Sequence, residues 1–165
     1  AGRVAHAEAA CRLLADRAQR DERGPVVVEN RPGAGGNLGA AAAARAGHDG
    51  RTVLASIDTP FTVNPHLYRD MCFDPARDLV PLALVSSFPL VLVAHPGAAL
   101  SDLAGFLAAA KRQPLFYASA GVGSPGHLAM EHLRQRSGLA PGALEHVPLR
   151  GNTEALTAVL SGSAQ

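Results

Sequence analysis

The stretch YASAGVGSPGH, residues 117–127, places residues suited to three different chemistries in one short loop. Its glycines at 121, 123 and 126 have the G-x-G-x-x-G spacing of a dinucleotide-binding turn, and they stand between a predicted strand and a predicted helix. Two serines and a histidine lie among them. The loop could therefore hold a pyrophosphate, carry a nucleophilic serine, or bind another anion.

The dinucleotide-binding interpretation lacks the acidic residue that should follow the glycines. A dinucleotide fingerprint needs an acidic residue about 20 positions later, at the end of the next strand, to bind a ribose hydroxyl. Here the next predicted strand runs into Arg150, and Pro125 removes one amide from the first helical turn. An NADP-linked oxidoreductase domain, with Arg150 at a 2′-phosphate, stays open as an alternative.

The serines and histidines do not form a known catalytic or metal motif. A nucleophile elbow needs glycine two positions before and two positions after its serine, and neither Ser119 nor Ser124 has that pair. His127 and His132 are five positions apart, which separates them by about 140° around a helix. A helical zinc pair uses a spacing of four. The sequence therefore predicts no enzyme and no metal site.

An anion site is the simplest use of the loop. Gly121 and Gly123 let the backbone approach a ligand closely, and Ser124 and Pro125 suit the cap and the first position of a helix. The exposed amides and the positive end of the helix can bind a carboxylate as well as a phosphate. A tight strand-to-helix turn without a ligand is the structural alternative.

The composition describes an ordinary globular chain. Its 165 residues are 47% hydrophobic and 18% charged, which is enough for one core or two small lobes. The net charge is +1, aromatic residues make up 4%, and tryptophan is missing. A nucleic-acid surface needs a basic stripe with stacking residues, so no nucleic-acid partner is expected.

Neither the longest apolar passage nor the cysteines indicate a special class of protein. Residues 82–94 are interrupted by two serines and Pro89, and they fall short of the ~20 residues of a membrane-spanning helix. Cys11 and Cys72 are too few for a disulfide framework or a metal site, although one bridge between them stays possible. Cys11 is expected to be a small buried side chain in a helix.

Hydrophobic periodicity and turn residues predict alternating helices and strands. The expected helices are residues 4–19, 37–47, 101–113, 125–138 and 153–162. The expected strands are residues 25–30, 51–56, 82–87, 90–96, 115–119 and 144–149. Asn37 and Ser101 are predicted helix caps. The glycines of RPGAGG, residues 31–36, are assigned a structural role in a sharp turn, with Gly39 allowing close packing.

The order of these elements predicts two α/β lobes. A strand, a glycine turn and a helix occur on either side of an irregular, proline-rich stretch at residues 57–81. Loops of about 25 residues usually carry function or connect lobes. The chain is expected to cross from one lobe to the other near residues 84–95.

Taken in order, several segments resemble one family of receptors. PVVVENRPGAGGNLGA, DGRTVLAS, NPHLY, DPARDLVPLALV, YASAGVGSPGHLAMEHL and HVPLRGNTEALTAVLSG are similar to segments of the substrate-binding receptors of tripartite tricarboxylate transporters, the Bug-type periplasmic proteins. The resemblance runs from about Cys11 to Gly162. It implies an α/β, two-lobed periplasmic binding protein of type II-like fold, incomplete at both ends. The expected lobes are residues 1–88, lacking the first strand, and 89–165, truncated at the C-terminus.

The resemblance also implies a function. Such receptors bind a small mono-, di- or tricarboxylate in the cleft between their lobes and deliver it to a membrane permease. The expectation is a periplasmic solute receptor without catalytic activity, cofactor or metal, although this chain shows no signal peptide. A remnant that no longer binds an acid is the second alternative.

The family's ligand contacts can be carried over to matching positions. The first lobe would offer Ser56 and Thr59 from the segment SIDTP. The second lobe would offer Ser119, Ala120, Gly121, Gly123, Ser124 and His127. The family's PYKGG is PLRGN here, which assigns its last positions to Arg150 and Gly151. One departure concerns the first loop, where the family's P-G-G and aspartate fall on Arg3, Val4, Ala5 and Glu8.

Overall fold

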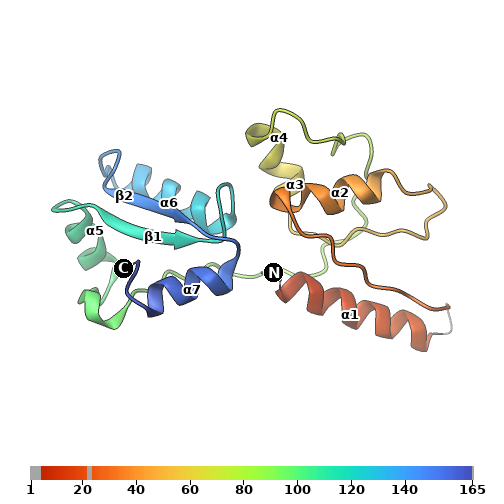
Figure 1. Cartoon of the computed structure of the whole chain (residues 1–165), viewed down its shortest axis with the longest axis horizontal. Coiled ribbons are helices and arrows are strands. Elements are labelled where there is room, and N and C mark those ends of the chain that lie inside the picture. Colours follow the sequence, from red (N-terminus) through yellow and green to blue (C-terminus); the bar gives the residue numbers. More distant parts are fainter. Residues whose placement is uncertain (1–4, 22–23, 165) are drawn as a thin grey trace. The chain divides into compact units, whose positions relative to one another are not determined.

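The chain divides into two compact units. The computed structural model describes residues 5–21 and 24–164, with side chains from residue 9 onward, so the expectations for Arg3 and Val4 and for the side chains of Ala5 and Glu8 lie outside it. One unit extends to Phe88, and the other begins at Pro89 (Figure 1). Each unit has its own architecture.

The unit that begins at Pro89 is a small α/β layer. Its elements are the 3₁₀ helix η2 (Pro96–Ala98), α5 (Leu103–Ala110), β1 (Leu115–Ser119), α6 (Pro125–Arg136), β2 (Leu144–Pro148) and α7 (Asn152–Leu160). The two strands run parallel, from Leu115 opposite Leu144 to Ser119 opposite Pro148. α6 contacts both strands and α7 contacts β1. The predicted strands at residues 115–119 and 144–149 and the three predicted helices of this unit are confirmed.

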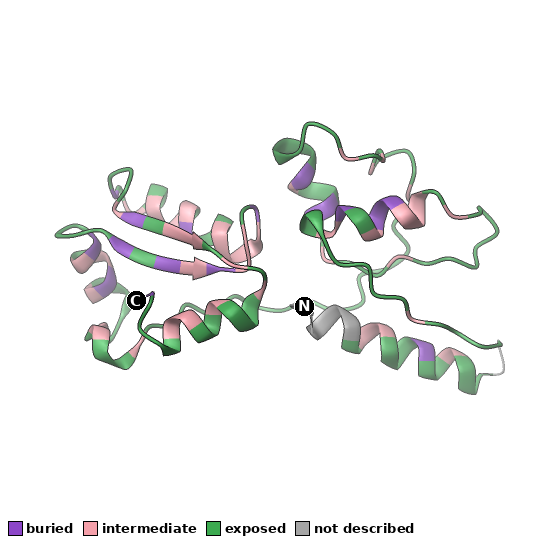
Figure 2. Ribbon diagram, viewed as in Figure 1, coloured by how far each residue is buried: buried purple, intermediate pink, exposed green. Residues whose placement is uncertain are grey.

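The core of this unit forms on one face of the strand pair. Leu115, Tyr117 and Ser119 of β1 are buried whereas Phe116 is 44% exposed, which is the alternation of a half-buried strand (Figure 2). Leu115 and Tyr117 of β1 cluster with residues of α5, α6, the turn after α6 and β2, namely Phe106, Ala110, Met130, Leu139 and Leu144. Because the strands are parallel, their carboxyl ends at Ser119 and Pro148 lie at the same edge.

The unit that ends at Phe88 contains helices and irregular segments. Its helices are α1 (Ala5–Arg20), η1 (Ala34–Gly36), α2 (Asn37–Ala44), α3 (Thr59–Thr62) and α4 (Asn64–Leu67). The prediction of helix 4–19 is confirmed within the described residues, and α2 ends earlier than predicted. α3 and α4 lie in the stretch that was expected to be irregular.

Four strand predictions were wrong. Residues 25–30, 51–56, 82–87 and 90–96 form no strand in the described part of the chain. Their apolar side chains are largely exposed: Val27 is 87% exposed, Leu84 87% and Val91 77%. A run of β-branched residues becomes a strand only when a neighbouring strand accepts its backbone hydrogen bonds and covers its side chains. These runs find no such neighbour among the described residues.

A pair of buried asparagines joins the glycine loop to α4. Asn64 is 1% exposed, and its Nδ2 donates to Asn37 Oδ1 at 2.6 Å and to the Gly35 carbonyl at 3.1 Å. Asn37 therefore does not cap α2 as predicted. Gly36 takes the cap position with a φ of 95°, and a Cβ there would lie 2.9 Å from Pro60 Cγ. The loop thus has the structural role that its sequence indicated.

Two further expectations needed correction. The cap of α5 is Asp102, whose Oδ1 accepts from Gly105 N at 2.7 Å, because the helix begins one residue later than a Ser101 cap would require. Cys11 is half-buried rather than buried, and Cys11 and Cys72 are both free thiols. Among the described helices, none combines the length and the apolarity that crossing a membrane requires.

The asparagine pair gives a stability prediction. Replacing Asn64 by Ala leaves the buried Asn37 Oδ1 and the Gly35 carbonyl without their donor, so the free energy of unfolding is expected to fall by about 1–3 kcal/mol. Urea unfolding followed by circular dichroism measures the change. Asn30→Ala, at an exposed position, is the matched control and should change stability by under about 0.5 kcal/mol. Equal unfolding midpoints for the two variants would contradict this role.

Candidate functional site

The turn after β1 connects the strand to α6 through two glycines with left-handed backbone. Gly121 has a φ of 124° and Gly123 a φ of 77°, conformations that residues with a Cβ rarely adopt. A Cβ at Gly121 would lie 3.3 Å from the Leu149 carbonyl oxygen. Ser124 caps α6, since its Oγ accepts from His127 N at 3.3 Å, as the sequence predicted. The glycines therefore let the turn lie close to the end of β2.

The Ser119 hydroxyl is the centre of a hydrogen-bond network. Its Oγ lies 2.7 Å from Nε2 of His146. It also accepts from Gly121 N at 3.3 Å and from the Ser124 hydroxyl at 3.1 Å. Ser119 is 5% exposed, so these bonds form away from bulk water. One buried oxygen thus ties together β1, β2, the turn and the start of α6.

Two stacked imidazoles lie beneath the turn. The rings of His127 and His146 have centroids 4.2 Å apart and planes inclined by 19°. His146 also stacks on Tyr117 at 4.9 Å, because these residues are register partners of the parallel strands. Nδ1 of His127 accepts from Gly123 N at 3.1 Å. Both histidines are half-buried.

Sequence reasoning named His127 but missed His146. Alternation places His146 on the same strand face as Leu144, which is a core signal. The register that brings it to Ser119 and Tyr117 depends on how the two strands pair, and no residue spacing specifies that pairing.

Burial favours the neutral forms of His146 and Tyr117 by shifting their pKa values. Burial lowers the pKa of the His146 imidazole, the neighbouring His127 lowers it further, and the carboxylate of Glu131 acts in the opposite direction. Burial and the nearby Glu131 raise the pKa of Tyr117 to about 12. The Tyr117 hydroxyl donates to Glu131 Oε1 at 3.4 Å, and Arg134 pairs with the other oxygen of Glu131 at 2.9 Å. The carboxylate of Glu131, which acts on His146, is therefore paired with Arg134.

The start of α7 lies against the same turn. Leu149 N donates to the Ser119 carbonyl at 3.0 Å, which holds the residues after β2 beside the end of β1. Gly151 is the cap of α7, and Arg150 N donates to Glu154 Oε2 at 3.0 Å. The structure thus brings Arg150 and Gly151 to the edge where Ser119, Ala120, Gly121, Gly123, Ser124 and His127 lie. Two helix N-termini point their partial positive charge at this edge.

The remaining predicted contacts belong to the other compact unit. Thr59 is the first residue of α3 and is 4% exposed, whereas Ser56 is exposed. Ser56 lies near the glycine loop, because a Cβ at Gly36 would lie 3.8 Å from Ser56 Oγ. The helix α3, which begins at Thr59, contacts η1 of the same loop.

The network limits what Ser119 can do chemically. A serine oxygen 2.7 Å from an imidazole nitrogen is the first part of a nucleophilic pair. A hydroxyl has two lone pairs, and those of Ser119 accept from Gly121 N and the Ser124 hydroxyl. Both lone pairs of this buried oxygen are therefore occupied by donors of the protein itself, and the Ser119 hydroxyl also donates to the Gly121 carbonyl at 3.2 Å. The arrangement orients the groups of the turn.

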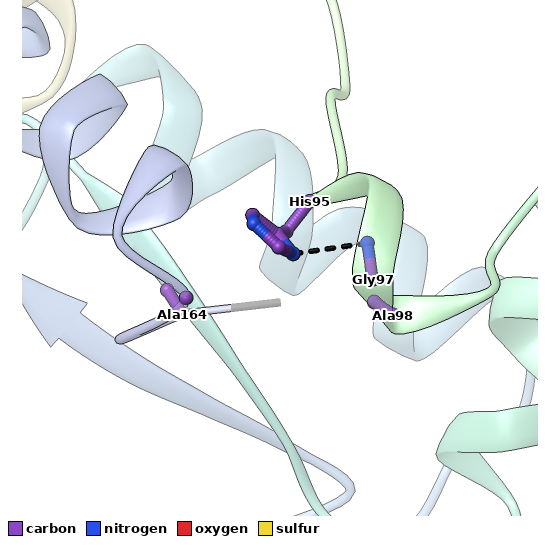
Figure 3. Close-up of a pocket in the computed structure, with 5 residues that line it drawn as sticks. His95, Gly97, Ala98 and Ala164 are labelled. Carbon is purple, nitrogen blue, oxygen red and sulfur yellow. Dashed lines mark hydrogen bonds between the residues drawn. The ribbon is translucent and has the colours of Figure 1, made fainter.

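Two hollows lie elsewhere in the same unit. One of about 160 Å³ is lined by His95, Gly97, Ala98, Gly162 and Ala164. Its imidazole Nδ1 already accepts from Gly97 N at 3.0 Å (Figure 3). A second lies at Ala109, Arg112 and Gln113. Within residues 5–21 and 24–164, no group of three or more His, Cys, Asp or Glu residues could hold a metal ion.

Known proteins share this sequence and fold. Residues 10–165 match the family described as tripartite tricarboxylate transporter family receptor. The protein BugT of Bordetella pertussis is 36% identical over 154 residues, which cover 92% of this chain and 46% of BugT. A UPF0065 protein of Pseudomonas sp. (strain P51) is 34% identical over 157 residues, which cover 94% of this chain and 46% of that protein. The chain spans about half the length of the curated relatives that it matches.

The fold of this chain is also similar to that of a solved structure described as a periplasmic transporter. It has a TM-score of 0.74 and 28% sequence identity, over 97% of this chain and 53% of that chain. The expected α/β fold of a periplasmic binding protein is confirmed by this likeness.

The close approach at Gly121 can be tested by substitution. Gly121→Ala is expected to destabilise the fold by about 1–3 kcal/mol, because it adds both an unfavourable φ and a contact with the Leu149 carbonyl. Two controls separate these causes. Gly142 has a φ of 85°, but no atom lies close to the position of an added Cβ. Gly47 has neither a positive φ nor a nearby atom. Thermal unfolding should rank the losses in the order Gly121, Gly142, Gly47, and a Gly121 loss no larger than that of Gly142 would exclude the contact.

The pKa of His146 predicts a pH dependence of stability. Because the folded state disfavours the charged imidazole, the unfolded state binds more protons once the pH falls below about 6.5, the ordinary pKa of histidine. Stability contributed by neutral His146 is present above that pH and is lost as the pH falls through the lower folded-state pKa. Urea unfolding at a series of pH values should show this decrease, and His146→Gln should reduce it. His132→Gln, at an exposed position on α6, should keep the original profile.

Proposed function

We propose that this chain, which belongs to the receptor family of tripartite tricarboxylate transporters, is part of a periplasmic solute receptor that binds a small organic acid. The acid's carboxylate is held at the turn after β1, and the receptor passes the acid unchanged to a membrane permease. The family, the likeness to a periplasmic transporter and the chemistry of the turn support this role.

The backbone amides of the turn are the observation that carries the proposal. The N–H groups of Ala120 and Val122 donate to no acceptor within the described part of the chain, although their neighbours Gly121 and Gly123 do. They lie in the turn that leads into α6, whose helix dipole favours negative charge at its N-terminus. A carboxylate oxygen accepts strong hydrogen bonds from such donors. Neither cation nor catalytic base is needed to hold it.

A second half of the site is assigned to the unit that ends at Phe88. We propose that the two compact units correspond to the two lobes, residues 1–88 and 89–165, and that Ser56 and Thr59 contribute contacts to the acid from the first. Hydroxyl groups can accept from or donate to the acid's second polar group. Arg150, which is exposed at the start of α7, adds positive charge near the carboxylate.

Ligand binding tests the proposal directly. Thermal shift and calorimetry with succinate, citrate, L-glutamate and benzoate should identify at least one acid that stabilises the chain. At 100 times its Kd, that acid should add about 2.7 kcal/mol to the free energy of unfolding. NADP is the comparison ligand and is expected to give no shift. Stabilisation by NADP, or by none of the acids, would refute the receptor role.

A substitution in the turn locates the binding site. Gly123→Ala strains a backbone with a φ of 77° and displaces the neighbouring N–H donors, so the affinity for the acid should fall by at least about tenfold. Gly142→Ala has a similar φ of 85° in a different turn and should leave the affinity unchanged. An equal loss of affinity in the two variants would contradict a binding site at the turn.

A further inference from the structure

We propose that the bond between Asp49 and Gly50 is a site of spontaneous modification, at which the aspartate is converted to isoaspartate through a cyclic succinimide. The site lies in the turn after α2 and is separate from the proposed acid-binding residues, so the inference does not depend on the receptor role. Three observations carry it: the residue pair itself, the open backbone of Gly50 and the position of the Asp49 carboxyl group.

The reaction needs only these two residues and water. The backbone nitrogen of Gly50 attacks Cγ of the protonated Asp49 carboxyl group, an N–Cγ bond forms, and the carboxyl OH leaves as water with the proton of the nitrogen. Water then adds at the backbone carbonyl carbon of Asp49 and breaks the bond from that carbon to the nitrogen. The main chain now runs through the side-chain carbon, and the former backbone carbonyl is a free carboxylate. One water leaves and one returns, so the mass of the chain is unchanged.

The sequence restricts this reaction to one position. A residue that follows aspartate hinders the attack with its side chain, and glycine has none. Asp49 is followed by Gly50, whereas every other aspartate is followed by a residue with a side chain. No asparagine, which reacts in the same way, precedes a glycine. A single isoaspartate is therefore expected.

The fold leaves the attacking nitrogen open. Gly50 lies in a bend outside any helix or strand, and it is exposed. Its φ is 73°, and apart from its chain neighbours no atom lies within 4 Å of the position of an added Cβ. Within the described residues, the Gly50 N–H has no hydrogen-bond acceptor. The nitrogen can therefore react without the loss of a hydrogen bond or a core contact.

The Asp49 carboxyl group is folded back over the same peptide unit. Its Oδ1 accepts from Arg51 N at 3.0 Å, which holds the carboxyl group beside the bond that follows it. Oδ2 lies 3.7 Å from Nε of Arg51, and the Asp49 side chain is 58% exposed. An ion pair as exposed as this one is weak, so it does not prevent the carboxyl group from reacting.

The same carboxyl geometry occurs at Asp70 without the glycine. Oδ1 of Asp70 accepts from Cys72 N at 3.1 Å, and Asp70 is exposed, but the residue between them is Met71. Asp70 is thus an internal control for the effect of the glycine. Asp102 is a control for the effect of the fold, because its carboxylate caps α5.

Ageing of the folded chain tests the site. After prolonged incubation at neutral pH, peptide mapping with electron-transfer fragmentation distinguishes isoaspartate from aspartate at each position. Isoaspartate should accumulate at residue 49, at about ten times the level at Asp70 or more, because a side chain on the following residue slows the attack. Equal levels at the two positions, or none at residue 49, would overturn the inference.

A variant with a longer side chain identifies the ring that must form. Asp49→Glu keeps the charge at an exposed position, but its carboxyl group would have to close a six-membered ring, which forms far more slowly than the five-membered succinimide. A protein-isoaspartate methyltransferase adds a methyl group from S-adenosylmethionine to the freed carboxylate and so counts the modified residues. Methylation of the aged chain should fall to background in Asp49→Glu and stay unchanged in Asp70→Glu. Full methylation of Asp49→Glu would place the modification elsewhere and refute the proposal.

A peptide of residues 45–54 shows whether the fold protects the bond. Since the turn has no buried contact to break, the folded chain should form isoaspartate at a rate within about threefold of the peptide's rate. A rate in the folded chain that is lower than this would mean that the turn shields the bond, and the structural part of the inference would be wrong. Circular dichroism of the aged sample checks that the chain remained folded during the incubation.

Discussion

The half-buried edge of the unit that begins at Pro89 depends on one hydroxyl group. Ser119 Oγ lies within 3.3 Å of an imidazole of β2, an amide of the turn and the cap of α6. A hydroxyl has only one proton and two lone pairs, so each partner constrains the role of the others. The same partners that hold the turn in place occupy both lone pairs of the Ser119 oxygen. The amides of Ala120 and Val122 have no acceptor in the described part of the chain.

The two units show opposite outcomes for strand-forming sequences. Residues 115–119 and 144–148 pair with each other, bury alternate side chains and receive α6 and α7. Residues 25–30 and 51–56 have equal or greater β propensity, yet they form no strand in the described part of the chain. The difference lies in the neighbour, because a strand is stabilised by cross-strand pairs and not by its own residues alone. In the unit that ends at Phe88, the buried contact of Asn64 with Asn37 joins the glycine loop to the short helices.

The proposed receptor chemistry depends on where the two parallel strands end. Both strands finish at one edge, and both following helices begin there, so backbone donors and helix dipoles gather without any charged side chain being buried. The proposed site would hold its anion with these neutral donors.

The sequence alone determined the local features of this protein. Several features could be predicted because each depends on residues adjacent in the chain. These are the glycines at 121 and 123, the cap at Ser124, the proline in the first turn of α6 and the strand at residues 115–119. The family could be identified for the same reason, because its short sequence motifs occur in this chain in the expected order. Only the tertiary structure decided which strand-like runs pair, that Asn37 binds Asn64 instead of capping α2, and that His146 lies against Ser119 and His127. Those contacts join residues about 20 or more positions apart, and their geometry depends on strand register and packing, which local residue patterns do not specify.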